Sequence, residues 1–219
     1  MRNLRTTCAL AGGLLALATV ATPAAAAPAT AADDCADVNV IVVRGTGEPG
    51  TFGWIIGDGL VGKVRAKVPG TKATALDYPA SIGRDSVPNG ITNLVATVTE
   101  RAAACPEEQQ VLVGYSQGAQ VVNGALGVDL TGTANAPMPA PSPLPTELSD
   151  HIAAIALFGD PLRKVDRSLP APYADRSVSY CQPKDLVCDP APDGRFLPHL
   201  AYAFNGDLNR ATAFIAGRV

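Results

Sequence analysis

Residues 114–118 read Gly-Tyr-Ser-Gln-Gly and place Ser116 at the centre of a G-x-S-x-G motif. The apolar residues 111–113 before it indicate a strand, and residues 119–126 after it have helical spacing. A serine between a strand and a helix is typical of a nucleophile elbow, in which a tight turn projects the hydroxyl above the sheet. Glycines are expected on both sides because neighbouring backbone packs too closely there for a Cβ. The alternative is an ordinary strand–turn–helix connection with a buried serine.

A serine hydroxyl is a weak nucleophile unless a base, usually a histidine oriented by a carboxylate, accepts its proton. The chain has two histidines, His151 and His199. Catalytic groups gather at the C-terminal ends of parallel strands, whereas His151 comes just before the predicted strand 152–158 and so at its opposite end. His199 follows the last predicted strand, in the chain order serine, acid, histidine of α/β-hydrolases. We therefore assign His199 as the base; otherwise it is an ordinary residue at the start of the closing helix.

Several aspartates could be the acid that orients this histidine. Asp160 is a rival because it directly follows a predicted strand. Asp185 is favoured because it follows the last strand and lies inside the loop that a Cys181–Cys188 bridge would close, which would restrict the position of its carboxylate. Asp189 and Asp193 lie nearby and remain alternatives.

The first 32 residues predict a secretory signal peptide and its cleavage region. Two arginines form a basic start, residues 8–20 form an apolar run too short to span a bilayer, and residues 21–32 are rich in alanine. Cleavage between residues 26 and 32 would leave residues 33–219 as one secreted domain. The alternative is a permanent N-terminal anchor.

Composition and cysteine content narrow the class of protein. The chain has 219 residues, 47% of them hydrophobic, and a formal net charge of −3, so it can form one substantial core but has no basic excess for binding nucleic acid. Four cysteines remain after the predicted cleavage, an even number for an oxidising compartment: Cys35, Cys105, Cys181 and Cys188. They allow three pairings. A zinc site is the competing interpretation, which the scarcity of histidines and of closely spaced cysteines disfavours.

Strand and helix patterns alternate along the chain. Strands are expected near residues 38–43, 72–76, 110–113, 152–158 and 178–180, and helices near residues 52–68, 91–104, 119–126 and 199–219. This alternation predicts a three-layer α/β/α sandwich with a central, mostly parallel sheet. The proline-rich residues 134–145 can form neither a helix nor a central strand and are expected to make a surface excursion.

Four segments together resemble the cutinase family, over roughly residues 35–219. They are Arg-Gly-Thr-Gly-Glu at 44–48, the elbow at 114–118, Cys-Gln-Pro-Lys-Asp-Leu-Val-Cys at 181–188 and His-Leu-Ala-Tyr at 199–202. Many members have glycine before the acid, where this chain has Lys184, and the long proline run resembles the actinobacterial branch.

The resemblance implies a lid-poor α/β-hydrolase with a shallow, exposed active site. The implied triad is Ser116, Asp185 and His199. The implied oxyanion hole uses Thr46 and the backbone N–H of Gln117. The implied disulfides are Cys35–Cys105 and Cys181–Cys188.

These features predict a secreted, extracellular serine esterase that acts through an acyl-enzyme on cutin-like polyester, lipid or short-to-medium acyl esters. No metal or organic cofactor is required, and we expect a monomer with no stable membrane span. Phe196 and Leu197 are candidates for contacting the acyl chain, or alternatively for the core. One competing function is acetyl xylan esterase activity, which an aromatic content of 5% weakly disfavours. Another is a catalytically idle secreted binding protein, which the complete set of serine, acid and histidine disfavours.

Overall fold

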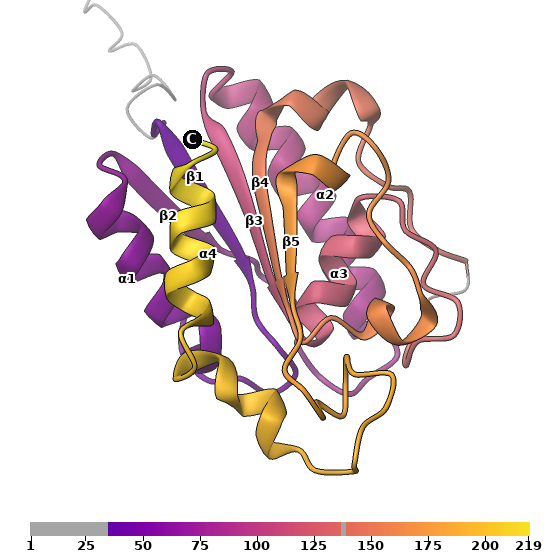
Figure 1. The fold of residues 1–219 in the computed structure, drawn as a ribbon. Coiled ribbons are helices and arrows are strands. Elements are labelled where there is room, and N and C mark those ends of the chain that lie inside the picture. The colour runs from indigo at the N-terminus through magenta and orange to yellow at the C-terminus, as the bar shows by residue number, and fades with distance from the viewer. Residues whose placement is uncertain (1–34, 137–138) are drawn as a thin grey trace, which may run out of the picture. The chain divides into compact units, whose positions relative to one another are not determined.

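A computed structural model describes residues 35–136 and 139–219, and its centre is a five-stranded sheet between two layers of helices (Figure 1). The strands are β1 (Val38–Val43), β2 (Thr71–Ala75), β3 (Gln109–Tyr115), β4 (Ile152–Phe158) and β5 (Ser177–Tyr180). Their order is β2-β1-β3-β4-β5, and every neighbouring pair is parallel. The predicted three-layer α/β fold is confirmed, with a sheet that is entirely parallel.

Helices cover both faces of this sheet. One face packs against α1 (Asp58–Lys67) and α4 (Asp207–Ala216), and the other packs against α2 (Ser86–Ala104) and α3 (Gln117–Ala125) (Figure 1). Shorter turns of helix connect the elements: η2 (Gly53–Gly57), η3 (Thr146–His151), η4 (Pro161–Val165), η5 (Ala174–Arg176) and η6 (Leu197–Ala203).

Strand β1 shows how the sequence builds the two faces. All six of its residues are buried. Val40 and Val42 pack in the cluster that includes α1 and α4, whereas Ile41 and Val43 pack in the cluster that includes α2 and α3. Successive strand residues point to opposite faces, so a continuous apolar run is what a central strand covered on both sides requires.

Two helices differ from the sequence-based expectation. Helix α2 begins at Ser86, five residues early, because Pro88 lies in the first turn, where its missing N–H is not needed. The expected helix over 199–219 is divided in two: η6 ends at Ala203, and α4 begins after Gly206, which has a φ of 90°. His199 therefore lies on the separate short helix η6 and not at the head of the closing helix.

The proline-rich segment forms neither helix nor strand over its described residues, 134–136 and 139–145, as expected. It is anchored at both ends: Leu144 is buried and its N–H donates to the carbonyl of Ala125 (2.8 Å), while the Gln120 side chain donates to the carbonyl of Ala134 (2.7 Å). The predicted signal peptide lies outside the described residues. Within the described residues, no helix has both the length and the apolar character needed to cross a membrane.

Candidate active site

Ser116 occupies a strained turn between β3 and α3. Its backbone has φ 55° and ψ −117°, a conformation that residues other than glycine rarely adopt and that is typical of functional sites. The flanking glycines allow the close approach. A Cβ on Gly118 would lie 1.9 Å from the carbonyl oxygen of Val43, and a Cβ on Gly114 would lie 2.7 Å from the Cα of Ala119. The turn has the geometry expected of a nucleophile elbow.

The structure brings Asp185 to His199. Nδ1 of His199 lies 2.9 Å from Oδ1 and 2.9 Å from Oδ2 of Asp185, and both side chains are buried. Nε2 of His199 has no hydrogen-bond partner among the described residues. A neutral imidazole carries one proton, and the neighbouring carboxylate places it on Nδ1. Nε2 is then free to accept a proton.

The other acid candidates have different partners. Asp160 caps η4, where its Oδ1 accepts the backbone N–H of Leu162 (2.9 Å). Asp189 accepts backbone N–H groups of its own loop, and Asp193 pairs with an arginine on the surface. His151 lies at the end of η3, just before β4 begins, and so at the end of the sheet opposite the serine.

Several groups keep the Asp185 carboxylate ionised. Burial alone would raise its pKa, but hydrogen bonds from His199, Tyr202 and the Val187 N–H outweigh burial, so the pKa lies below its usual value. The imidazole is held from a second side by Tyr115. The ring of Tyr115 stacks on it with centroids 4.8 Å apart, and the Tyr115 hydroxyl donates to the His199 carbonyl (2.8 Å).

Gly159, directly after β4, makes room for the imidazole. It has a φ of 57°, and a Cβ there would lie 2.5 Å from Cε1 and 2.8 Å from Nδ1 of His199. Carbon atoms in contact are ordinarily about 3.5–4.0 Å apart. The sequence marks this position only as the end of a strand.

The loop that carries Asp185 is closed by the Cys181–Cys188 disulfide, with a Cα–Cα distance of 5.8 Å. Lys184 adopts a φ of 69°, the left-handed conformation that favours glycine, and its N–H donates to Asp189 (2.6 Å). Lysine at this position therefore takes the backbone conformation that a glycine would take. The other disulfide joins Cys35 to Cys105, so both bridges are those that the resemblance implies.

A pocket of about 460 Å³ joins the serine and the histidine. Its lining includes Ser116, His199, Thr46, Trp54 and Phe196. The Phe196 side chain is 53% exposed, and its ring centroid lies 5.2 Å from that of His199. Leu197 is 74% exposed and is not among the lining residues. The core alternative for these two residues is therefore wrong.

Glu48 holds the loop that presents Thr46 to this pocket. Its two carboxylate oxygens accept the backbone N–H groups of Gly45 (2.5 Å) and Ile55 (2.9 Å), which joins the loop after β1 to η2. Burial raises the pKa of Glu48 above its usual value, and the two N–H groups oppose that rise. Glu48 belongs to a motif singled out in the sequence, but nothing in that motif indicated its role.

Gln117 begins α3, where backbone N–H groups have no partner inside the helix. Its side chain spans to the neighbouring loop: Nε2 donates to the Ser81 carbonyl (2.8 Å), and Oε1 accepts from the Ser86 hydroxyl (2.9 Å). With the side chain fixed in this way, the backbone N–H remains the group available to a ligand at the elbow.

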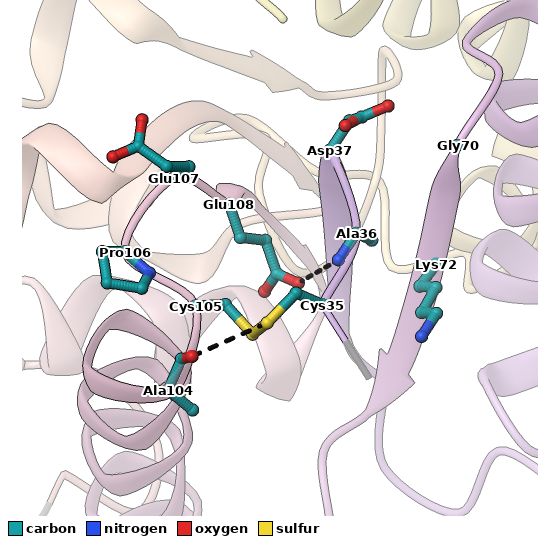
Figure 2. A pocket seen from close by; sticks show the side chains of 10 residues that line it. All are labelled: Cys35, Ala36, Asp37, Gly70, Lys72, Ala104, Cys105, Pro106, Glu107 and Glu108. Carbon is teal, nitrogen blue, oxygen red and sulfur yellow. Dashed lines mark hydrogen bonds between the residues drawn. A yellow bond between two sulfur atoms is a disulfide. The ribbon is translucent and has the colours of Figure 1, made fainter. Parts of the chain in front are cut away.

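A larger pocket of about 600 Å³ lies at the opposite end of the sheet, around the Cys35–Cys105 bridge (Figure 2). Glu108 accepts the Ala36 N–H there at 3.1 Å. None of the residues assigned to catalysis lines this pocket.

The parallel sheet, the serine elbow after β3 and the histidine after the last strand define an α/β-hydrolase. A family model described as Cutinase matches residues 34–219. The chain therefore belongs to the cutinase family and is a carboxylic ester hydrolase.

Individual relatives agree with this assignment. The chain is 39% identical over 190 residues to a protein of Kineococcus radiotolerans named cutinase, covering 84% of this chain and 62% of that protein. It is 33% identical over 215 residues to carboxylesterase Culp1 of Mycobacterium tuberculosis, covering 93% of this chain and 90% of that protein.

Two solved structures from Trichoderma reesei share the fold. A cutinase in complex with a phosphonate inhibitor has a TM-score of 0.66 and 30% identity, covering 84% of this chain and 76% of that chain. The catalytic core domain of an acetyl xylan esterase has a TM-score of 0.69 and 28% identity, covering 84% of this chain and all of that chain.

Proposed function

We propose that this protein is a secreted serine esterase in which Ser116 is the nucleophile, His199 the base and Asp185 the acid. The observation that carries the proposal is the state of the imidazole. Nδ1 lies 2.9 Å from both oxygens of a buried, ionised carboxylate, whereas Nε2 has no hydrogen-bond partner among the described residues. Ser116 and His199 also line the same pocket.

The reaction that fits this arrangement has two halves. Nε2 of His199 takes the proton of Ser116 as Oγ attacks the ester carbonyl carbon, and the oxyanion is stabilised by Thr46 and the Gln117 N–H. The protonated imidazole then gives its proton to the leaving alcohol. Water, activated by the same nitrogen, releases the acid from the acyl-enzyme. Asp185 remains ionised throughout and stabilises the imidazolium.

Secretion is supported by the signal-like first 32 residues and by two disulfides, which persist in oxidising compartments. Protein recovered from the culture medium of an expressing host should begin between residues 27 and 33. An N-terminus at residue 1 in medium-derived protein would contradict the predicted cleavage.

The nucleophile is tested by replacing Ser116 with alanine and by treatment with a phosphonate ester. Ser116→Ala should keep the circular dichroism spectrum and lose ester hydrolysis, down to a residual acceleration of about 10³–10⁴ over water from binding and the oxyanion hole. The phosphonate should label Ser116 alone in the native enzyme. Full activity in a folded Ser116→Ala variant would overturn the mechanism.

The two histidines provide a matched pair of variants for the base, and two aspartates provide one for the acid. His199→Ala should be nearly as inactive as the serine variant, and His151→Ala should keep most of its activity. Asp185→Asn should lower kcat strongly with little change in KM, because it alters the orientation and charge of the imidazole and not substrate binding. If Asp160→Asn were the crippling change instead, the acid assignment would be wrong.

The substrate class can be resolved by an activity profile. The exposed Phe196 and Trp54 beside the serine support an apolar acyl chain. Acetyl xylan is the second candidate, because the whole of the acetyl xylan esterase core aligns with 84% of this chain. The profile compares p-nitrophenyl esters of rising acyl length with acetylated xylan and an emulsified lipid. Rates on the p-nitrophenyl esters should rise from acetate to medium-length acyl chains. A preference for acetylated xylan would favour the second candidate.

A further inference from the structure

Tyr202 is a buried residue next to the proposed triad, and the mechanism above gives it no part. It is fully buried on η6, three residues after His199. Its hydroxyl lies 2.5 Å from Oδ2 of Asp185, 3.2 Å from the backbone nitrogen of Gln182 and 3.4 Å from Sγ of Cys188. The aromatic ring packs edge-on against the His199 ring, with centroids 6.2 Å apart.

The hydroxyl proton of Tyr202 has one good destination. A phenol has one proton to donate. The backbone N–H of Gln182 is itself a donor to the Tyr202 oxygen, so it cannot receive this proton. Sγ of Cys188 is part of a disulfide and is only a weak acceptor. Burial raises the pKa of Tyr202 above its usual value, and the hydrogen bond to Asp185 raises it further, so the proton stays on the phenol and points at the carboxylate.

The carboxylate of Asp185 has one additional donor on each oxygen. Oδ1 accepts the Val187 N–H (2.7 Å), and Oδ2 accepts the Tyr202 hydroxyl. Both oxygens also lie 2.9 Å from Nδ1 of His199. Without Tyr202, Oδ2 would keep only the imidazole, and the carboxylate would be both freer to rotate and more basic.

The local helix explains why one segment can hold both groups. In a 3₁₀-helix, side chains at positions i and i+3 lie above one another. His199 and Tyr202 have this spacing on η6 and approach the same carboxylate from one short element. The His-Leu-Ala-Tyr motif therefore contains the proposed base and a donor to the proposed acid.

We propose that Tyr202 is a positioning residue of the reaction, which acts through Asp185 by fixing its carboxylate and limiting its basicity. This inference rests on the proposed triad. Tyr202 does not touch the reacting atoms; it sets the orientation and proton affinity of the acid that holds the imidazole.

The test is Tyr202→Phe, which removes the hydroxyl and keeps the ring. We expect kcat to fall about tenfold, which corresponds to about 1.4 kcal/mol, with KM within about twofold. On the acid limb of the kcat/KM profile, activity is lost as the imidazole is protonated. This limb should move to higher pH by about half a unit, because a more basic Asp185 favours the protonated imidazole. A purely structural role of the hydroxyl would not move this limb.

Tyr173→Phe is the matched control. Tyr173 is also buried, but its hydroxyl has no hydrogen-bond partner within the described part of the chain, and it packs with α2 and α3 on the opposite face of the sheet. Its variant should leave kcat and the pH profile unchanged. If the control lowered kcat as much as Tyr202→Phe, general loss of packing would be the cause and the proposal would fail.

A second substitution covers the case in which Tyr202→Phe does not fold. A fluorinated tyrosine at position 202 keeps the shape and is a stronger donor, so the acid limb should move to lower pH. An unchanged limb in the folded variants would overturn the role of Tyr202. Failure of the proposed function is recognised separately, because ester hydrolysis by the unmodified protein would then not depend on Ser116.

Discussion

Adding one methyl group at Gly159 should disable the proposed active site while leaving most of the fold in place. The Cβ of Gly159→Ala would lie 2.5 Å from Cε1 of His199, whereas carbon contacts are ordinarily about 3.5–4.0 Å apart, so the imidazole must move by about 1 Å. A displacement of about 1 Å in a catalytic group can cost about 10²-fold in rate. We therefore expect kcat to fall about 100-fold with little change in KM.

Gly194→Ala is the matched control for this prediction. Gly194 also has a positive φ, 82° against 57° at Gly159, but a Cβ there would have no heavy atom within 4 Å. Both variants introduce an alanine in the left-handed region, at about 1–2 kcal/mol each. Gly159→Ala should lose about a further 1–3 kcal/mol of folding stability, because the added methyl group overpacks the site.

The assay measures kcat and KM on p-nitrophenyl butyrate for both variants, together with their thermal melts. Gly194→Ala should keep the kcat of the unmodified enzyme and unfold at a slightly lower temperature. If folded Gly159→Ala turned over as fast as Gly194→Ala, the imidazole would not occupy the position that the structure gives it. The reasoning from the close contact would then be refuted.

Three further changes test the surroundings of the site. Replacing Cys181 and Cys188 by serine should cost about 2 kcal/mol of stability and lower kcat far more than this loss suggests, because the disulfide closes the loop that carries Asp185. Kinetics and thermal melts that show an active but less stable variant would argue against a role of the disulfide in positioning Asp185. Glu48→Gln should lower kcat about tenfold, because an amide can accept only one of the two N–H groups that the carboxylate accepts; kinetics that match the unmodified enzyme would contradict this. Phe196→Ala should lower kcat/KM on long acyl esters by roughly 1 kcal/mol and leave acetate esters within about twofold, whereas equal losses on both would exclude an acyl-chain contact.

Much of the fold could be read from the sequence because its signals are local. Continuous β-branched runs mark strands that are covered on both faces, and β4 has the predicted bounds. The elbow at Ser116 is equally local, since a strand, two glycines and a helix lie within a few residues. The chain also offers only two histidines, and the polarity of a parallel sheet separates His199 from His151.

Which aspartate lies beside His199, and how the residues of the proposed site fit together, needed the tertiary structure. Asp160 and Asp185 both follow strands, and only the packing of η6 against the disulfide loop brings one of them to the imidazole. The division of the closing helix, the donor role of Tyr202 and the space left by Gly159 depend on segments distant in sequence. Spacing along a chain fixes which residues share an element, but contacts between elements depend on how their side chains fill the space between them, and no local pattern records that.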